Sequence, residues 1–231
     1  MDAQETLVRM VTHRLPEHLG SKAEIQVLTP QIRGTLGTNN LNLVLQEAIN
    51  PPRDGVRELQ IGHTTFREGD RVIHLRNNYD LGVFNGDIGT ILRIERDQSL
   101  IVIFSGEESR PICYNGENAR DLALAYAITV HKAQGSEFDA VVMPVVPQHY
   151  MMLYRNLVYT GLTRAKKMMV FIGARQSFAR AVHNKEQMQR LSRLRTLLDV
   201  QEPLLEGPTR QILTKRMKGR LNKEFIQTLL P

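Results

Sequence analysis

The chain has 231 residues, 42% of them hydrophobic, and a formal net charge of +6, which favours one or two folded soluble domains and excludes a disordered or membrane-spanning protein. Its single cysteine, Cys113, excludes an intrachain disulfide and indicates a reducing compartment. Residues 208–231 hold six basic side chains and one acidic side chain, so most of the positive charge belongs to this stretch.

The first quarter of the chain predicts a helix, a strand and a second helix, from the spacing of its apolar residues. These elements are expected over residues 6–15, 24–29 and 38–49. Pro16 is expected to end the first helix. Thr38 or Asn39 is expected to cap the second helix, since both side chains accept hydrogen bonds from the first helical N–H groups.

The middle of the chain changes to short strands separated by turns, which predicts a small β-barrel over residues 64–118. Its strands are expected over residues 69–75, 88–93, 100–104 and 111–114. A turn-rich junction at 85–89 and a hairpin turn at 96–99 separate them.

From residue 119 onward the pattern returns to alternating strands and helices. The apolar runs 140–143 and 168–173 predict buried parallel strands. Helices are expected over 150–165 and 176–184, and an amphipathic surface helix over 186–198. The remaining basic tail predicts either a helix or a disordered segment.

Two polar clusters lie beside the buried strands. The first reads TVHKAQGSE over 129–137, and the second reads YTGLTRAK over 159–166. Ligands of open α/β sheets bind in the crevice at the carboxyl ends of the strands, so we expect both clusters to face that crevice. The seven histidines show no ligand-like pairing, so no metal site is expected.

The two clusters resemble motifs V and VI of superfamily 1 DNA helicases, in the same order and spacing. The spelling T-V-H-K-x-Q-G-S-E-F followed by Y-T-x-x-T-R-A-K resembles the RecD-like branch, as does VLTPQxRGTLGTxxLNxxLQExxNP over 27–51. The resemblance covers about 5–198. It implies an α/β fold in which a RecA-like parallel sheet, with helices on both faces, is interrupted by a small Src-homology-3-like β-barrel.

This resemblance implies three domains. The second RecA-like motor domain would be discontinuous, with a barrel inserted into it and a basic tail after it. The expected boundaries are 1–63 with 119–199 for the motor domain, 64–118 for the barrel and 200–231 for the tail.

The resemblance further implies that the parent protein is an ATP-dependent 5′–3′ DNA helicase of the cytoplasm. ATP and Mg²⁺ would be held mainly by an N-terminal motor domain of the same parent chain. Single-stranded DNA and subunits of a nuclease complex are the other implied partners, with no membrane. The sequence contains no G-x-x-x-x-G-K-[ST] loop and no Walker B acidic pair, so this chain alone is expected to be inactive.

Arg164 is the expected catalytic residue and nucleotide contact. In the resembled family the arginine of this motif reaches ATP as an arginine finger, and a guanidinium fork suits charge on a transferring phosphoryl group. The resemblance also places Gly135, Ser136 and Glu137 at the nucleotide. The alternatives are a surface arginine, a helix-capping glycine and a solvated acid.

Hydroxyl, imidazole, amide and cationic side chains bind phosphate and sugar oxygens without reading sequence. By this resemblance and chemistry, the residues expected to contact DNA are Thr129, His131, Lys132, Gln134, Arg33, Arg76, Asn78 and Tyr79. The barrel loop that holds the last three combines charge with an aromatic ring for stacking. Phe84 is expected to fill the barrel core, and a merely packed or exposed histidine is the alternative for His131.

Two other functions remain open. The chain would be a non-enzymatic single-stranded DNA-binding module if the barrel and the basic tail did all the binding. It would be the helicase part of a conjugative relaxase if a histidine-rich nuclease domain preceded it. An upstream phosphate-binding loop in the same reading frame would favour the helicase.

Overall fold

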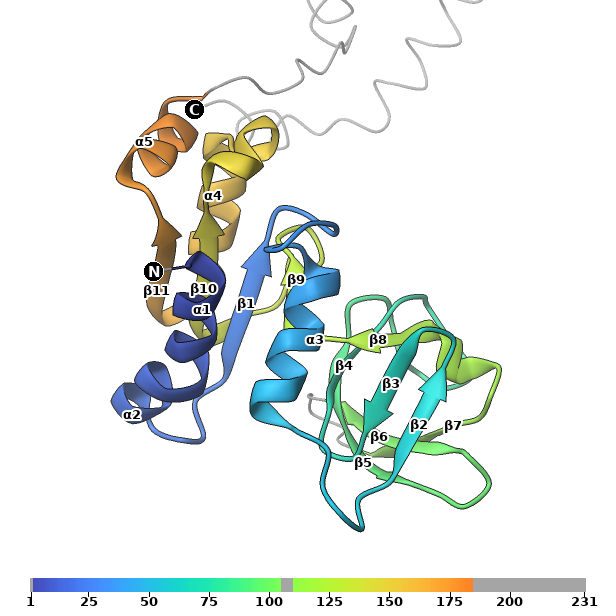
Figure 1. Ribbon diagram of the computed structural model, residues 1–231. Helices are drawn as coiled ribbons and strands as arrows, with labels where there is room; N and C mark the ends of the chain where they lie inside the picture. The colour runs from blue at the N-terminus through green and yellow to red at the C-terminus, as the bar shows by residue number, and fades with distance from the viewer. Residues whose placement is uncertain (1, 105–109, 185–231) are drawn as a thin grey trace, which may run out of the picture. The chain divides into compact units, whose positions relative to one another are not determined.

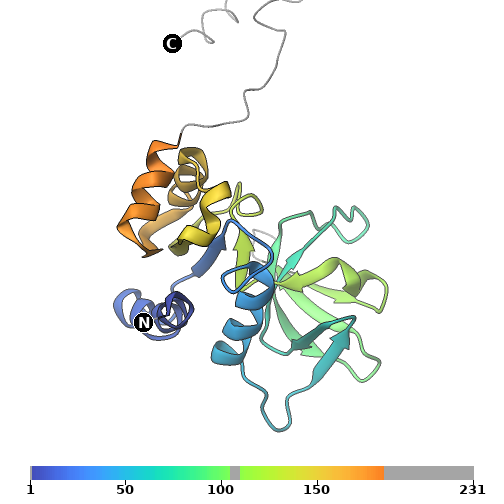
Figure 2. The same ribbon diagram turned by 45° about the horizontal axis from the view of Figure 1, so that its top comes forward.

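The computed structural model describes residues 2–104 and 110–184. A four-stranded parallel sheet and a mainly antiparallel barrel make up this part of the chain (Figures 1 and 2). The helix expected over 186–198 and the basic tail lie outside the described residues.

The parallel sheet has the order β11-β10-β1-β9. The strands are β11 (Ala165–Gly173), β10 (Phe138–Val145), β1 (Ile25–Thr29) and β9 (Ala127–Thr129). Strand β10 pairs in parallel with both β1 and β11, and all but one of its residues are buried. A strand covered on both faces needs apolar residues at successive positions, which confirms the parallel strand predicted from the run 140–143.

Helices cover both faces of this sheet, as predicted. On one face, α1 (Ala3–Arg9) and α3 (Thr38–Ile49) pack with Val142. On the other face, α4 (Arg155–Leu162) and α5 (Arg175–His183) pack with Val141 and Met143. Successive residues of β10 therefore enter different halves of the core.

The N-terminal helix does not end at Pro16. It continues from α1 through the π-helix Met10–Arg14 into α2 (Leu15–Leu19). Pro16 lies at the start of α2, directly after the π-helix, and the helical backbone passes through it. The helix ends instead at Gly20, whose φ of 92° is readily adopted by glycine.

The cap predicted for α3 is also wrong. Its N-cap is Gly37, which offers no side chain, and Thr38 is already helical. The first N–H groups bind carbonyl oxygens of the preceding loop: Thr38 N donates to Gln31 O and Asn39 N to Ile32 O, both at 3.0 Å. Backbone carbonyl oxygens of this loop therefore cap α3 in place of the predicted side chain.

The single helix predicted over 150–165 is two shorter elements. A 3₁₀ helix (Pro147–Met152) precedes α4, and Tyr154 between them is extended. Asn184, at the end of α5, holds this break: its carbonyl accepts from Arg155 N at 3.0 Å and its Nδ2 donates to Leu153 O at 3.1 Å. Ala165 already belongs to β11.

The barrel consists of a hairpin and a five-stranded sheet. The hairpin is β2 (Glu58–Ile61) with β3 (Thr64–Arg67), and the sheet has the order β7-β6-β5-β4-β8. The sheet strands are β7 (Pro111–Tyr114), β6 (Leu100–Phe104), β5 (Ile88–Ile94), β4 (Arg71–His74) and β8 (Leu122–Leu124). Strands β2 and β8, which pair with the barrel strands, lie outside the range 64–118. The domain boundaries at 64 and 118 stay a prediction.

A buried carboxylate joins the barrel to α3. Asp70 is fully buried, and its oxygens accept hydrogen bonds from Gln46 Nε2 at 2.6 Å, Asn50 Nδ2 at 2.8 Å and the Tyr126 hydroxyl at 2.8 Å. The backbone N–H of Arg67 adds a fourth bond at 2.7 Å. A buried charge is tolerated when it is hydrogen-bonded in this way, so α3, β3 and the segment leading to β9 are tied together.

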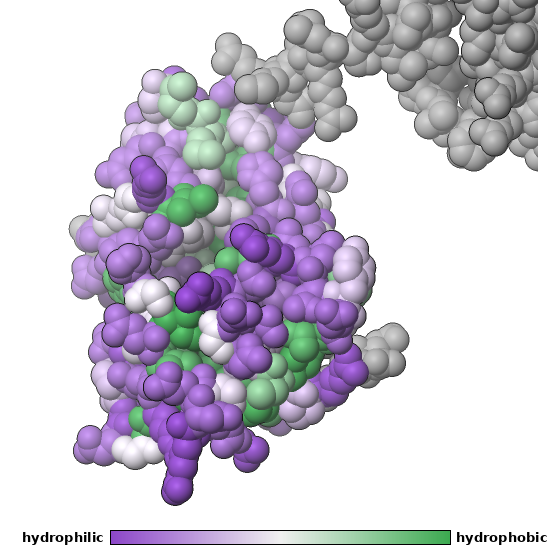
Figure 3. Space-filling view, turned by 90° about the vertical axis from the view of Figure 1, so that its right-hand side faces the viewer, coloured by the Kyte–Doolittle hydropathy of each residue, from purple (hydrophilic) through white to green (hydrophobic). Residues whose placement is uncertain are grey.

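The surface of the barrel side is ordinary for a globular domain. Figure 3 shows separate small hydrophobic patches among hydrophilic side chains on that face. In the part of the chain that the structure describes, no helix has the length and apolarity to cross a bilayer. The same part contains no cluster of three or more metal-ligating side chains.

Candidate nucleotide and nucleic-acid sites

The two polar clusters do not face one crevice. Phe138 and Ala165 are paired at the amino ends of β10 and β11, so Ser136, Glu137 and Arg164 lie at that edge. Thr129 is paired with Thr29 at the carboxyl ends of β9 and β1. The connection 130–137 runs from one edge of the sheet to the other, because parallel strands all begin at the same edge. The expectation of a shared crevice is therefore wrong.

This connection is held by its own backbone and by two buried side chains. Thr129 Oγ1 accepts a hydrogen bond from Lys132 N at 3.3 Å, and Thr129 O accepts one from Ala133 N at 3.2 Å. Val130 and Ala133 are buried, whereas His131 and Gln134 are exposed. The loop therefore turns polar groups outward while its apolar residues anchor it to the core.

Arg164 ties the two clusters together at the amino edge of the sheet. Its Nη1 donates to Ser136 O at 3.1 Å, and its Nη2 donates to Thr163 Oγ1 at 3.2 Å. Its own carbonyl accepts a hydrogen bond from Phe138 N at 2.9 Å. The sequence motifs thus bring Ser136 and Arg164 into contact, though Ser136 uses its backbone oxygen.

Gly135 and Glu137 flank this contact. Gly135 has a φ of 91°, and a Cβ at this position would meet nothing within 4 Å. The backbone conformation, rather than space, is therefore what favours glycine here. Glu137 Oε2 lies 3.9 Å from Lys166 Nζ, and both side chains are more than half exposed, so this ion pair contributes little.

The guanidinium of Arg164 is not neutralised by an acid. Arg67 and Arg71 form ion pairs with Glu58 and Glu24, at 2.7 and 2.6 Å. Within the described residues Arg164 instead binds two neutral oxygens, and its buried Nε has no partner. A half-buried cation with unused donors is suited to an anion such as a phosphate.

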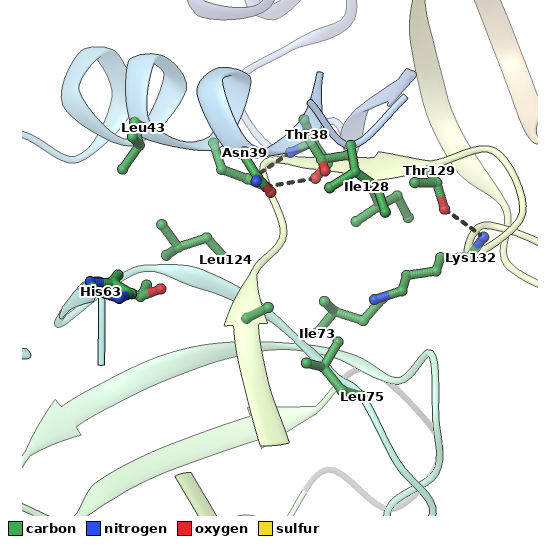
Figure 4. A pocket seen from close by; sticks show the side chains of 15 residues that line it. Thr38, Asn39, Leu43, His63, Ile73, Leu75, Leu124, Ile128, Thr129 and Lys132 are labelled. Atoms are coloured by element: carbon green, nitrogen blue, oxygen red, sulfur yellow. Dashed lines mark hydrogen bonds between the residues drawn. The ribbon is translucent and has the colours of Figure 1, made fainter. Parts of the chain in front are cut away.

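A pocket of about 440 Å³ lies at the opposite, carboxyl end of β9. Figure 4 shows Leu43 and Asn39 of α3 on one side of it and Ile73 of β4 with Leu75 on the other, with Leu124, at the end of β8, between them. Most of its lining is apolar, and polar groups occur toward its rims. The lining residues are Ile32, Thr38, Asn39, Asn42, Leu43, His63, Thr64, Ile73, Leu75, Ala123, Leu124, Ala127, Ile128, Thr129 and Lys132.

Lys132 extends over this pocket. Figure 4 shows its side chain lying between Ile128 and Ile73. Loss of water around its amine lowers the pKa of Lys132 from its ordinary value, and no acidic side chain acts to raise it. Among residues 2–104 and 110–184, the site therefore holds a cation without a counter-ion. Arg33, on the loop after β1, is exposed near the same edge.

The barrel loop over 75–87 presents the other expected DNA contacts. Arg76 Nε lies 3.5 Å from Asp121 Oδ1, and Asn78 Oδ1 accepts a hydrogen bond from Leu81 N at 3.0 Å. A Cβ built at Gly86 would lie 3.9 Å from Lys132 O. This loop therefore adjoins the connection that follows β9, and the separate sequence segments meet in space.

Phe84 does not fill the barrel core. It is 48% exposed, Tyr79 is 78% exposed, and their rings meet edge to face with centroids 6.0 Å apart. The prediction for Phe84 was wrong because the loop folds on polar turns: Asp87 Oδ2 accepts from Phe84 N, and Asn77 Oδ1 accepts from Asn85 N. Sequence reasoning also missed the apolar pocket wall, since those residues read as ordinary strand and helix positions.

Two segments of the chain match protein-family models. Residues 41–104 match the SH3 domain of the ATP-dependent RecD-like DNA helicase, and residues 124–172 match the UvrD-like helicase C-terminal domain. The first segment contains most of α3 and strands β2 to β6, and the second contains β9, β10 and most of β11 with both polar clusters. The chain belongs to the RecD-like helicase family. Its α/β fold with an inserted barrel agrees with that assignment.

The curated relatives of this RecD-like chain include a DNA helicase and a subunit of the RecBCD enzyme. The ATP-dependent RecD2 DNA helicase of Deinococcus radiodurans is 43% identical over 148 residues, which cover 64% of this chain and 20% of that protein. The RecBCD enzyme subunit RecD of Buchnera aphidicola is 30% identical over 161 residues, covering 68% and 26%. The chain thus spans about a fifth to a quarter of their lengths.

A solved structure is also similar to this RecD-like chain. The crystal structure of the Bacteroides Pif1 helicase in complex with ADP-AlF₃ and single-stranded DNA aligns with a TM-score of 0.48 and 18% identity. The alignment covers 72% of this chain and 44% of that chain.

Proposed function

We propose that this chain is the C-terminal motor part of an ATP-dependent 5′–3′ DNA helicase that works in the cytoplasm. It supplies the arginine finger, Arg164, and part of the track that holds single-stranded DNA. An N-terminal motor domain of the same parent chain holds most of the ATP and its Mg²⁺. Without a phosphate-binding loop of its own, the chain alone does not hydrolyse ATP.

The observation that carries this proposal is the state of Arg164. The guanidinium binds Ser136 O and Thr163 Oγ1 and keeps unused donors, with no ion pair among the described residues. Negative charge on a transferring γ-phosphoryl group is what such a fork stabilises. Gly135, Ser136 and Glu137 are adjacent to it, so a nucleotide at this edge would also meet the connection 130–137.

The separation of the two edges gives this connection a second role. One end of it, at Thr129 and Lys132, faces the pocket, and its other end contacts Arg164. A change at the nucleotide edge is therefore transmitted to the DNA edge through about eight residues of backbone. Such coupling allows a strand to be gripped and released once per hydrolysis cycle.

Unwinding of tailed duplexes by the complete natural protein tests this function. We expect ATP-dependent unwinding of a duplex with a 5′ single-stranded tail and none of a duplex with a 3′ tail. The 231-residue chain, assayed with single-stranded DNA, should release no phosphate above background. Partner subunits of a nuclease complex would copurify with the complete protein if it works within one.

Each part of the proposal has its own contradicting result. Unwinding only from 3′ tails contradicts the polarity, and DNA binding without unwinding from either tail contradicts the helicase. Turnover by the chain alone near one per second, typical of working enzymes, contradicts its inactivity if a substitution in this chain alters it.

A further inference from the structure

We propose that the pocket beside Lys132 holds one nucleobase of the bound strand, turned inward from its phosphates. The inference rests on the proposed function, because it assumes that a single strand passes the carboxyl end of β9. It adds that the protein contacts the flat apolar face of a base at this point, as well as the charged phosphates of the strand.

The first argument is the chemistry of the pocket wall. A phosphate track needs donors and cations, yet Ile73, Leu75 and Ile128 line this pocket. Leu43, from α3, also lines it while remaining 56% exposed. Apolar side chains gain free energy by covering the face of a base and gain nothing from a phosphate. The volume of about 440 Å³ falls within the range of about 300–1,000 Å³ found for ligand pockets.

The second argument is the unbalanced charge at the rim. Lys166 and Lys167 have carboxylates within 3.9 and 2.9 Å. In the part of the chain that the structure describes, Lys132 has none, and the loss of surrounding water lowers the pKa of its amine. A cation placed over apolar surface without an acid suits a ligand that joins an anionic group to an apolar body. A nucleotide within a strand is such a ligand.

The third argument is that some polar side chains of the pocket already form hydrogen bonds within the protein. Asn42 Nδ2 and Oδ1 both bind the backbone of Ala127 at 2.9 Å, so this side chain is occupied. Thr129 Oγ1 is bound to Lys132 N. Thr38 and Asn39 at the start of α3, and His63 and Thr64 on the hairpin, also line the pocket (Figure 4). Its buried wall, with Ile73 and Ile128, is apolar, which favours contact with the face of any base, as a translocating protein requires.

The test compares two oligomers of about eight units, within the span of about 4–16 nucleotides that single-strand-binding modules cover. One is oligothymidine, and the other is the same sugar-phosphate chain with every base removed. Binding to the 231-residue chain is measured by fluorescence anisotropy at low salt, with wild-type protein, Leu43→Asp and the control Leu92→Asp. Leu92 is 49% exposed on β5 and does not line the pocket.

We expect wild-type protein to bind oligothymidine at least about fivefold more tightly than the abasic oligomer, since base stacking is worth about 1–3 kcal/mol per base. Leu43→Asp should remove most of that difference, and Leu92→Asp should preserve it. The added charge is the same in both variants, and the abasic arm measures its effect on phosphate binding. Free thymidine monophosphate at equal nucleotide concentration should not compete, because the strand supplies the remaining contacts.

Other results distinguish a failure of the base pocket from a failure of the proposed single-stranded DNA track. Salt-sensitive binding of both oligomers with equal affinity overturns the base pocket and leaves the track in place. A base preference that Leu43→Asp and Leu92→Asp reduce equally also overturns it. Tight binding of the free monophosphate means a mononucleotide site instead of a strand site, and no binding of either oligomer contradicts the proposed track itself.

Discussion

At the scale of single residues, the structure separates side chains by whether their charge is balanced. Asp70 is buried with four donors, and Arg67 and Arg71 have acidic partners. Arg164 and Lys132 have none among the described residues, and both belong to the clusters that the sequence singled out. Unbalanced cations near a pocket or a loop edge mark functional positions more reliably than charge alone.

His74 gives a pH dependence at this scale. Its ring lies in the barrel core beside Phe104 and Tyr114, and its Nδ1 is 3.2 Å from the Tyr114 hydroxyl. Burial lowers the pKa of His74, against a smaller raising effect of Asp121 and Asp87. Below about pH 6.5 the unfolded chain therefore binds more protons than the folded chain. The free energy of unfolding decreases as the pH decreases through that range.

We expect the free energy of unfolding of wild-type protein to decrease as pH falls from about 7.5 to about 5.5. His74→Gln should make that decrease smaller, whatever its effect on stability at pH 7.5. Urea unfolding at several pH values measures both quantities. An unchanged pH slope in the variant would show that protonation of His74 does not oppose folding.

The sequence motifs indicated which residues lie near one another, but not which side chains are exposed to solvent. The sequence assigned Ser136 and Arg164 to one nucleotide site, which stays a prediction, and the structure brings these two residues, 28 positions apart, into contact. The exposure of Phe84 was not predictable, because an aromatic residue between turns has the same local pattern whether it points inward or outward. Only the closing of the loop by Asp87 and Asn77 decides it.

At the scale of elements, the segment around Asp70 fixes the barrel to α3. Its acceptor oxygens bind donors from α3, from β3 and from the segment before β9. The pocket lies between these same elements, so its width depends on this contact. Gln46 and Asn50 also donate to the carbonyl oxygens of Thr65 and Glu68, so the same two side chains bind the barrel backbone directly.

Asp70→Ala should lower the free energy of unfolding by about 3 kcal/mol or more, because four donors, the buried Tyr126 hydroxyl among them, lose the carboxylate that they share. Glu47→Ala is the matched control. Glu47 is 61% exposed in its ion pair with Arg67, so its loss should cost about 0.5 kcal/mol or less. Urea unfolding at neutral pH measures both variants. Equal losses of unfolding free energy in the two variants would mean that Asp70 stabilises the fold no more than an exposed acid does.

Element types were largely predictable, and element ends were not. Apolar runs and alternation located most of the strands, since burial on one or both faces dictates those patterns. Pro16, the Gly37 cap and the break at Tyr154 escaped prediction for one reason. Each is decided by backbone hydrogen bonds to a distant or unusual partner: the π turn, the loop carbonyls and Asn184.

At the scale of the whole molecule, the two functional edges are the main departure from the sequence-based expectation. The sequence placed both clusters at one crevice, whereas the parallel pairing puts Thr129, the start of the first cluster, at the carboxyl ends of the strands and leaves Ser136 with Arg164 at the amino ends. The three-residue strands β8 and β9 explain part of the difficulty. They are separated by two residues yet belong to different sheets, and no pattern that short distinguishes them.

The central claim is that Arg164 acts on a nucleotide held largely by another part of the parent protein. Measuring ATP turnover and ATP affinity of Arg164→Ala in the complete natural protein, with single-stranded DNA present, tests it most directly. A finger acts where charge develops in the transition state, so kcat should fall by about 10³ or more while the Kd for ATP stays within a few fold. Arg164→Lys should not restore turnover, because a point charge lacks the fork. Normal kcat in a folded Arg164→Ala protein would contradict the account.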